Sequence, residues 1–496
     1  MVDTDSHDRK RRSNVSRRTF VKAAGVSGIT AGLAGCVTND GGGSADEQID
    51  TSVPDGDVTV QFAADDRLQG IADQTQELLY EEGLPQNISL EVLAGSFVSD
   101  DRQNQYTQLL DAGQESPTLL LMDSGWTIPF IARDQLVNFS QQMPSDLVDD
   151  IQGNYFQASV DTVSNTDGEL YGMPMFPDFP VMHYRKDVYE SAGYNPESDN
   201  WATEPITWSE FSQATADAQE EAGTDYGFTF QANIYEGLSC CDFNEFMSSW
   251  GGAYFGGREN LFGPVGDRPV TVDEQQVIDS IRMVRTFING SDDEFAMDDY
   301  QKISPEAVLQ WTEEPSRQPY TNGNAVANRN WPYAIPINGA EDAFGEDHGT
   351  MPIPYAVPES ESPYEGLGGT SSALGGWHAV INPNAPAEKK SAAYHVLNAM
   401  KSEAFQLLAL EEIGWLPPRP ALFESDRAQN VPIIGRYIDT LRVAGENAVP
   451  RPVTTVWGQQ SDQIASEVNS AYAQQKTPED AMSSLKSSLE DIESSN

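Results

Sequence analysis

Short apolar stretches alternate with amphipathic helical stretches over the first part of the chain expected to fold. The pattern predicts strands over residues 57–62, 88–93 and 118–122, with helices over 67–82 and 102–113 between them. Strands that alternate with helices favour a parallel sheet, because each helix carries the chain back to the same end of the sheet. With 496 residues, 39% of them apolar, the chain is long enough for two or more domains of this α/β class.

Polar residues follow each of these three strands. Asp65 and Asp66 come after the first strand, Arg102 after the second and Asp123 after the third. In open parallel sheets, ligands bind beyond the carboxyl ends of the strands. The pattern therefore predicts a ligand site that includes these side chains.

The rest of the chain continues as helices separated by loops rich in Pro and Gly. Strands are expected over 323–331 and 373–381, and one long helix over 386–412. Residues 342–376 are rich in Pro, Gly and Ser, which is typical of surface loops.

The first 36 residues predict an export signal. Arg17 and Arg18 precede a weakly apolar, Gly- and Ala-rich run that ends at Leu33-Ala34-Gly35-Cys36. This order is typical of a twin-arginine signal over residues 1–35, whose removal leaves Cys36 for lipid attachment. Residues 36–56 have the composition of a flexible tether. The alternatives are a chance pair of arginines before a short core helix, and a signal anchor that stays in the membrane.

The chain is strongly acidic, with a formal net charge of -48. Such a surface repels itself in dilute buffer, so we interpret it as an adaptation to high salt, in which charges are screened over a few Å. Binding to nucleic acid needs clustered Lys and Arg, which the sequence lacks, so a nucleic-acid partner is not expected.

Cysteine and histidine give no indication of a metal site. The five histidines are scattered and no CxxC pair is present, so neither a metal nor another cofactor is expected. Cys240 and Cys241 are adjacent, and because a bridge between neighbours is strained we expect two separate, partly buried thiols.

Motifs for catalysis are also missing. The sequence contains no G-x-S-x-G, H-E-x-x-H, P-loop or G-x-G-x-x-G motif. Pairs of carboxylates such as Asp149-Asp150 and Asp292-Asp293 are better explained as solvated surface in so acidic a chain. No catalytic residue is predicted.

Aromatic, Gly and carboxylate or amide side chains recur together in expected loops. A sugar needs this combination, because its C–H face stacks on an aromatic ring while neighbouring hydroxyls donate to a carboxylate. The clusters are Asp123-Ser-Gly-Trp126, Phe176-Pro-Asp178-Phe179, Asn330-Trp331-Pro-Tyr333, Gly375-Gly376-Trp377-His378 and Gly414-Trp415.

Longer stretches around these clusters resemble the extracellular solute-binding proteins that serve ABC importers, in the maltose- and trehalose-binding branch. The stretches occur in the family's order between about residues 58 and 460. They are Asp101-Arg102-Gln-Asn-Gln-Tyr106, Leu121-Met-Asp123-Ser-Gly-Trp126, Gly168-Glu-Leu-Tyr-Gly-Met-Pro174 through Asp187, Asn244-Glu-Phe-Met-Ser-Ser-Trp250-Gly-Gly252, Gly323 through Tyr333, and Leu374-Gly-Gly-Trp377.

The resemblance implies an α/β fold of the periplasmic-binding-protein type II class, with two lobes joined by crossing strands and a ligand cleft between them. The first lobe is expected over 57–175 and 332–398, and the second over 176–331 and 399–496. It also implies a sugar ligand, an ABC permease as partner, a lipid anchor at Cys36, a monomer, and a place on the extracellular face of the membrane.

The resemblance carries over site residues where the motifs match. Arg102 and Asp123 would bind sugar hydroxyls from the first lobe, and Arg451 would reach in from the second. Asp178, Phe176, Trp331, Gly376 and Trp377 would complete the pocket. The sequence departs from the family pattern at two places, and these departures leave the exact sugar open. Phe176 stands where the family often has a tyrosine, and Asp65-Asp66 stands where the family usually has a glutamate.

Two other functions remain open from the sequence. A secreted glycoside hydrolase or lyase uses the same residue types, but needs two opposed carboxylates that the sequence does not nominate. A receptor with a polyamine or another small solute as its cargo is compatible with the excess of carboxylates.

Overall fold

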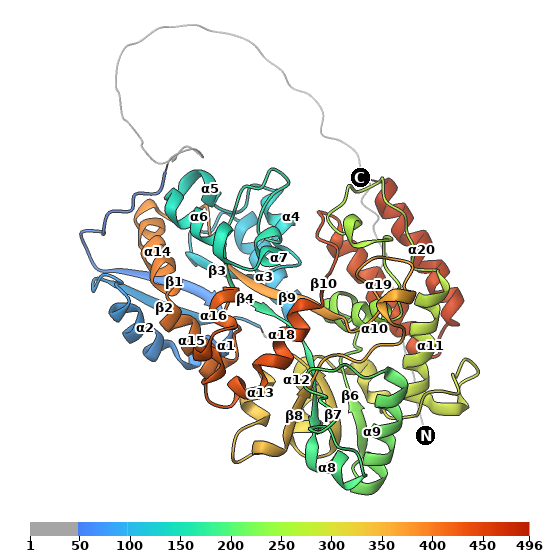
Figure 1. Cartoon of the computed structure of the whole chain (residues 1–496). Helices are drawn as coiled ribbons and strands as arrows, with labels where there is room; N and C mark the ends of the chain where they lie inside the picture. Colours follow the sequence, from blue (N-terminus) through green and yellow to red (C-terminus); the bar gives the residue numbers. More distant parts are fainter. Residues whose placement is uncertain (1–47, 97, 496) are drawn as a thin grey trace, which may run out of the picture. The chain divides into compact units, whose positions relative to one another are not determined.

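The computed structural model of the protein describes residues 48–96 and 98–495 (Figure 1). The predicted signal with Arg17 and Arg18, the predicted lipid site at Cys36 and the first part of the tether lie outside the described residues. Within the described part, none of the helices combines the length and the apolar composition needed to cross a membrane.

The first sheet has six strands and confirms the parallel arrangement predicted for the start of the chain. Its order is β10-β9-β3-β1-β2, and β4 also pairs with β9. Strand β1 is parallel to β2 and β3, while β9 is antiparallel to β3 and β4. Every residue of β3 is buried, as expected for a central strand covered on both faces. The strands are β1 (Val58–Ala64), β2 (Ile88–Ala94), β3 (Leu119–Asp123), β4 (Met173–Asp178), β9 (Ser372–Ile381) and β10 (Ala448–Pro450).

Two helices expected as single elements near this sheet are each interrupted. The first is divided at Ile71, whose backbone leaves the helical region. The second is divided at Ser402, whose side chain accepts a hydrogen bond from the amide of Phe405 and so caps a new helix. The helices beside the sheet are α1 (Asp66–Gly70), α2 (Ala72–Glu81), α3 (Ser99–Asp111), α14 (Ala387–Met400) and α15 (Glu403–Ile413).

The second sheet has four strands in the order β6-β7-β5-β8. Helix α9 packs on it, beginning at a capping box formed by Thr207 and Glu210 and ending at the left-handed Gly223. The elements of the sheet and of α9 are β5 (Val181–Arg185), α9 (Trp208–Ala222), β6 (Tyr226–Thr229), β7 (Ala325–Asn330) and β8 (His348–Met351).

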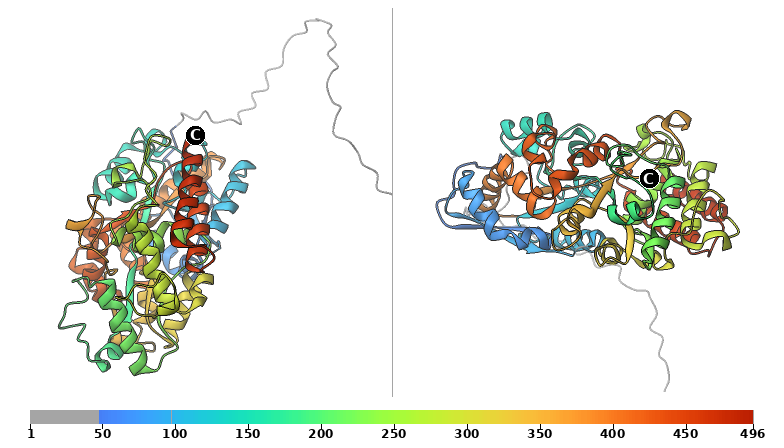
Figure 2. Two further views of the ribbon diagram at one scale, coloured as in Figure 1. Left: turned by 90° about the vertical axis from the view of Figure 1, so that its right-hand side faces the viewer. Right: turned by 60° about the horizontal axis from the view of Figure 1, so that its bottom comes forward.

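Further helices complete the second lobe. The two C-terminal helices lie side by side and are coloured red in Figure 2. A buried ion pair between Arg268 and Glu493 ties the last helix to the loop before Gln275, with 2.7 Å between Nη2 and Oε1. These helices are α10 (Phe243–Ser249), α11 (Gln275–Asn289), α12 (Glu313–Thr321), α19 (Trp457–Tyr472) and α20 (Pro478–Ser494).

Four elements lie in the range expected for one lobe but pair or pack with the sheet of the other. Residues 176–178 of β4 lie in the range expected for the second lobe, yet they pair with β9 of the first sheet. Strand β8 lies within 332–398, expected in the first lobe, yet it pairs with β5 of the second sheet. Helix α15 and strand β10 lie within 399–496, expected in the second lobe. However, α15 packs against α2, and β10 pairs with β9 of the first sheet. A short apolar pattern predicts a strand but does not say which sheet the strand joins.

Candidate functional site

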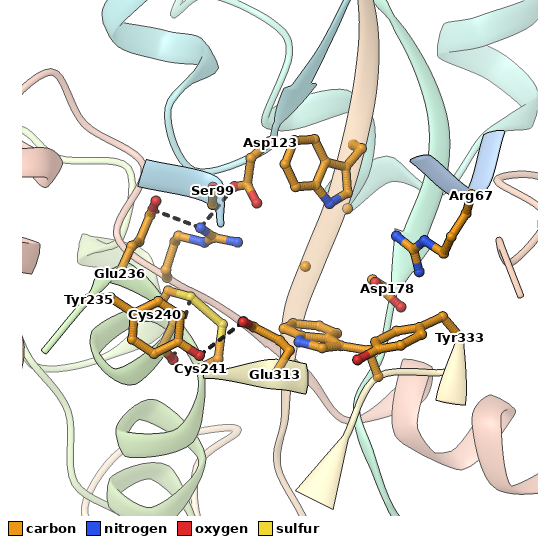
Figure 3. Close-up of a pocket in the computed structure, with 16 residues that line it drawn as sticks. Arg67, Ser99, Asp123, Asp178, Tyr235, Glu236, Cys240, Cys241, Glu313 and Tyr333 are labelled. Atoms are coloured by element: carbon orange, nitrogen blue, oxygen red, sulfur yellow. Dashed lines mark hydrogen bonds and ion pairs between the residues drawn. A yellow bond between two sulfur atoms is a disulfide. The ribbon is translucent and has the colours of Figure 1, made fainter. Parts of the chain in front are cut away.

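A pocket lies where elements of the two sheets meet, and its walls combine charged, aromatic and glycine residues (Figure 3). The space between its lining atoms is about 630 Å³, open solvent included. The lining residues are Arg67, Ser99, Asp123, Asp178, Tyr235, Glu236, Gly237, Cys240, Cys241, Glu313, Trp331, Tyr333, Gly375, Gly376, Trp377 and Arg451.

Three neighbouring strands of the first sheet deliver one side of this pocket. Asp123 is the last residue of β3 and lies opposite Trp377 of β9, while Asp178 ends β4 opposite Gly375. Gly375 has a steric role, because a Cβ there would come within 2.6 Å of the Trp331 ring. The glycine lets this indole, which follows β7 of the second sheet, pack directly against β9.

Arg451 joins the two lobes inside the pocket. Its Nη1 lies 2.9 Å from Oδ1 of Asp123 and 2.9 Å from Oε1 of Glu236. Trp457 also donates to this Oε1 atom, over 3.1 Å. Burial raises the pKa of Glu236, although the nearby Arg451 guanidinium acts in the opposite direction. Because Arg451 follows β10, it extends from the first sheet and not from the second lobe as expected.

Asp178 and Arg67 face one another at the other end of the pocket (Figure 3). Burial raises the pKa of Asp178 to about 8, and the positive charge of Arg67 opposes part of this rise. Arg67 is itself held by an ion pair with Asp65, over 2.7 Å, and its guanidinium lies 4.7 Å from the centre of the Tyr333 ring. The charge of the pocket wall is thus set partly by Asp65, which does not line it.

Besides Glu236, the second lobe contributes Glu313 and the rings of Tyr235 and Trp331. The Tyr235 hydroxyl donates to Oε1 of Glu313 over 2.9 Å. The Arg329 guanidinium lies 4.9 Å from the centre of the Trp331 ring and is buried in an ion pair with Glu245, over 2.7 Å. This pair fixes Arg329 beneath Trp331 and so orients the indole.

Cys240 and Cys241 form a disulfide, so the expectation of two separate thiols is wrong. The bridge lies in a π-helical turn over Leu238–Asp242. Neighbouring side chains on a regular α-helix point in different directions. No local pattern in the sequence indicates this wider turn. The expectation relied on the general strain of a disulfide between adjacent residues, and this strain did not prevent the bond here.

Six of the ten expected ligand-binding residues line the pocket: Asp123, Asp178, Trp331, Gly376, Trp377 and Arg451. Asp65, Asp66, Arg102 and Phe176 are not among the lining residues.

Three of these four lie behind the pocket or outside it. The Arg102 guanidinium lies 4.4 Å from the centre of the Trp377 ring and donates to the Ser96 carbonyl. Phe176 is buried and stacked on Trp415, with 4.4 Å between the ring centres. Asp66 is exposed in the first turn of α1. Arg102 and Phe176 therefore support the pocket wall from behind.

The sequence interpretation missed several lining residues. Arg67 and Ser99 follow β1 and β2, so the rule that selected Asp65 and Arg102 also applies to them. Glu236 lies in the helical turn directly before the π-helical turn, and Glu313 lies at the start of α12; no local pattern marks either residue. Among the described residues, no group of three or more His, Cys, Asp or Glu side chains has the arrangement to hold a metal ion.

A two-lobe α/β fold with a polar and aromatic pocket between its sheets defines a solute-binding protein. Residues 87–407 match the family described as bacterial extracellular solute-binding protein, and the chain belongs to this family. It is similar to a "Probable ABC transporter-binding protein" of Deinococcus radiodurans, with 27% identity over 401 residues, covering 79% of this chain and 83% of that protein.

Solved structures show the same fold. Maltose-bound MalE3 of T. maritima superposes with a TM-score of 0.72 at 25% identity, covering 87% of this chain and 99% of that one. The GacH receptor of Streptomyces glaucescens, studied unliganded and with acarbose, gives a TM-score of 0.67 at 16% identity, covering 88% and 98%. The second likeness supports the fold alone.

Proposed function

We propose that the protein is an extracellular receptor that binds a sugar, either a disaccharide or a short oligosaccharide, and delivers it to an ABC importer. The observation that carries the proposal is one pocket that combines two indoles, Trp331 and Trp377, with the carboxylates of Asp123 and Asp178. An indole stacks on the C–H face of a sugar ring, and a carboxylate accepts hydrogen bonds from adjacent hydroxyls.

One relative supports a sugar as the ligand, because the MalE3 structure contains maltose. The Deinococcus relative is named for an ABC transporter, which supports the permease as the partner.

Delivery requires that the receptor change shape when it binds. The pocket walls come from both lobes, so a ligand that contacts both favours the closed arrangement. Closure about the crossing strands would exclude water and strengthen the hydrogen bonds to Asp123 and Asp178. A monomer in the closed form would then be recognised by the permease.

The predicted signal gives the receptor its place. Export through Arg17 and Arg18 and lipid attachment at Cys36 would hold it on the outer face of the membrane, and the first part of the expected tether would give it reach. The tether was expected over 36–56, but residues 49–56 include backbone groups that hydrogen-bond to the folded body, so they do not belong to a free tether. The net charge of -48 supports the proposal that the receptor works in high salt.

A cationic cargo, such as a polyamine, is the second candidate. The pocket is lined by more acidic residues than arginines, which favours a positively charged ligand. The acidic residues are Asp123, Asp178, Glu236 and Glu313, and the arginines are Arg67 and Arg451. Against it, Arg451 already lies between two of these carboxylates.

A thermal-shift screen in molar salt tests the choice of ligand, because a ligand of the folded state raises the melting temperature. Maltose, trehalose, maltotriose and spermidine form the panel. We expect a rise with at least one sugar and none with spermidine, and the reverse result would support the cationic cargo.

Catalysis is tested separately by incubating the protein with oligosaccharides. We expect stoichiometric binding without turnover. Sustained release of cleaved product would instead support a hydrolase or lyase.

A further inference from the structure

The Cys240–Cys241 disulfide lies in the wall of the pocket (Figure 3). The same stretch of chain supplies three more lining residues, Tyr235, Glu236 and Gly237. Both cysteines are buried, with 4% and 2% of their surfaces exposed, so the bridge meets the pocket over a small area. A covalent bridge between neighbours in a ligand pocket is not needed to connect distant parts of the fold.

The turn that carries the disulfide is anchored from outside the pocket. The Ser239 hydroxyl lies 2.6 Å from that of Ser461 in α19, and the Tyr254 hydroxyl donates to the Ser239 carbonyl over 2.5 Å. On the other side, Asp242 accepts from the Gln231 amide over 3.0 Å and pairs with Arg329 over 3.2 Å. These contacts do not involve the sulfur atoms, so the position of the turn does not depend on the bridge alone.

The disulfide differs chemically from the wall around it. Glu236 and Glu313 are strong hydrogen-bond acceptors, and the Tyr235 hydroxyl is already used by Glu313. A disulfide has no hydrogen to donate, and its sulfur atoms are polarisable and weakly polar. Two free thiols would instead present S–H groups in independent rotamers beside these carboxylates.

We propose that the Cys240–Cys241 disulfide is a ligand-contact element that presents an apolar surface to a C–H face of the bound sugar. It selects ligands that place an apolar face, and not a hydroxyl, against this part of the wall. Its contribution depends on the oxidised state of the two cysteines. The inference rests on the proposed function, since it assumes that the pocket receives a sugar.

Calorimetric titration of the full chain with maltose and trehalose tests the inference. Three forms are compared: the oxidised protein, the same protein reduced by a phosphine, and the Cys240→Ala/Cys241→Ala double variant. Reduction consumes one water, breaks the S–S bond, gives two thiols and converts the phosphine into its oxide. Peptide mapping after thiol labelling reports the state of Cys240 and Cys241 separately from Cys36.

We expect the reduced protein and the double variant to bind about tenfold more weakly than the oxidised protein. The heat-capacity change of binding should become less negative, because less apolar surface is buried. Reoxidation should restore the affinity of the wild type, and the phosphine should leave the affinity of the double variant unchanged.

The outcomes that overturn the inference are distinct. Unchanged affinity and heat-capacity change in both altered forms would show that the ligand does not use the disulfide. Free thiols at positions 240 and 241 in the oxidised protein, or loss of folding in both altered forms, would also reject it. If the oxidised wild type binds neither these nor any other sugar, the proposed function fails first.

Discussion

Replacing Gly125 by alanine is expected to separate Arg451 from both of its carboxylate partners. A Cβ at position 125 would lie 2.8 Å from Cδ and Cζ of Arg451, and closer still to Nη1. The guanidinium must therefore move by about 1 Å to reach an ordinary separation. Its Nη1 now lies 2.9 Å from Asp123 and 2.9 Å from Glu236, so the move lengthens both ion pairs.

The cost follows from Coulomb's law. Moving Nη1 from 2.9 Å to about 4 Å weakens each ion pair by about 1.5 kcal/mol at an effective dielectric constant of about 20. The two pairs together give about 3 kcal/mol, comparable with the loss of one partner from a buried ion pair. Because Arg451 lines the pocket, sugar affinity should fall together with stability.

Urea unfolding followed by tryptophan fluorescence measures the stability, and calorimetry measures the affinity. Gly153→Ala is the matched control, because Gly153 lies in helix α6 (Ser145–Asn154) and a Cβ there would meet nothing within 4 Å. The control should be neutral or slightly stabilising, since alanine favours a helix. If Gly125→Ala behaves like this control in both assays, Arg451 is not held against Gly125 as described.

Four further predictions address the pocket and its surroundings. Trp331→Ala should weaken sugar binding about tenfold by calorimetry, because a stacking face is lost, and an unchanged affinity would exclude that role. Phe176→Leu should lower the free energy of unfolding by about 1 kcal/mol while leaving sugar affinity nearly unchanged, because Phe176 packs behind the pocket on Trp415; a large loss of affinity would place it in contact with ligand. Burial raises the pKa of Asp178 from its ordinary value of 3.8 to about 8, so between these two values the folded state holds a proton that the unfolded state has released. Melting temperature should therefore fall as the pH rises from about 4 to about 8, and it should fall less in Asp178→Asn; equal falls would contradict this assignment. Finally, raising KCl from about 0.1 M to about 2 M should raise the melting temperature, because the net charge of -48 is screened, and a fall would contradict the proposed adaptation to salt.

The first sheet could be predicted because its signals are local. Strands β1, β2 and β3 are short apolar runs separated by helical periodicity, and the parallel order follows from that alternation. The prediction of one long helix over 386–412 was wrong because a single residue ends the first helix and begins the next. Ser402 competes for the amide of Phe405, and this contact divides a long helical pattern into α14 and α15.

Assignment of segments to lobes needs information that a local pattern does not contain. Strand β8 pairs with β5 of the second sheet and helix α15 packs against α2 beside the first, each outside the lobe expected for it. These choices depend on contacts between residues far apart in the chain.

The pocket was predicted best where strand ends determine its residues. Asp123 and Asp178 end β3 and β4, and the indole of Trp377 lies opposite Asp123. Asp65 also follows a strand, but its carboxylate caps α1 by accepting from the amide of Leu68 and pairs with Arg67. The rule therefore identified an edge of the sheet that lines the pocket, while local hydrogen bonds decide which side chains reach it.

The disulfide and the second-lobe carboxylates could not be predicted by the same reasoning. Glu236 lies 2.9 Å from Arg451, more than two hundred residues later in the chain, so its surroundings in the pocket depend on a long-range contact. Cys240 and Cys241 meet because residues 238–242 form a wider helical turn, for which the sequence carries no evident pattern.

Calorimetric titration of the wild-type protein in molar salt, beside Asp123→Ala and Trp377→Ala, tests the central claim most directly. We expect saturable binding of one sugar per chain. Each substitution should weaken this binding by about 1–3 kcal/mol, through a lost hydrogen-bond acceptor or a lost stacking face. Unchanged affinity in both variants would show that the sugar binds elsewhere, and no binding of any sugar by the wild type would contradict the receptor function itself.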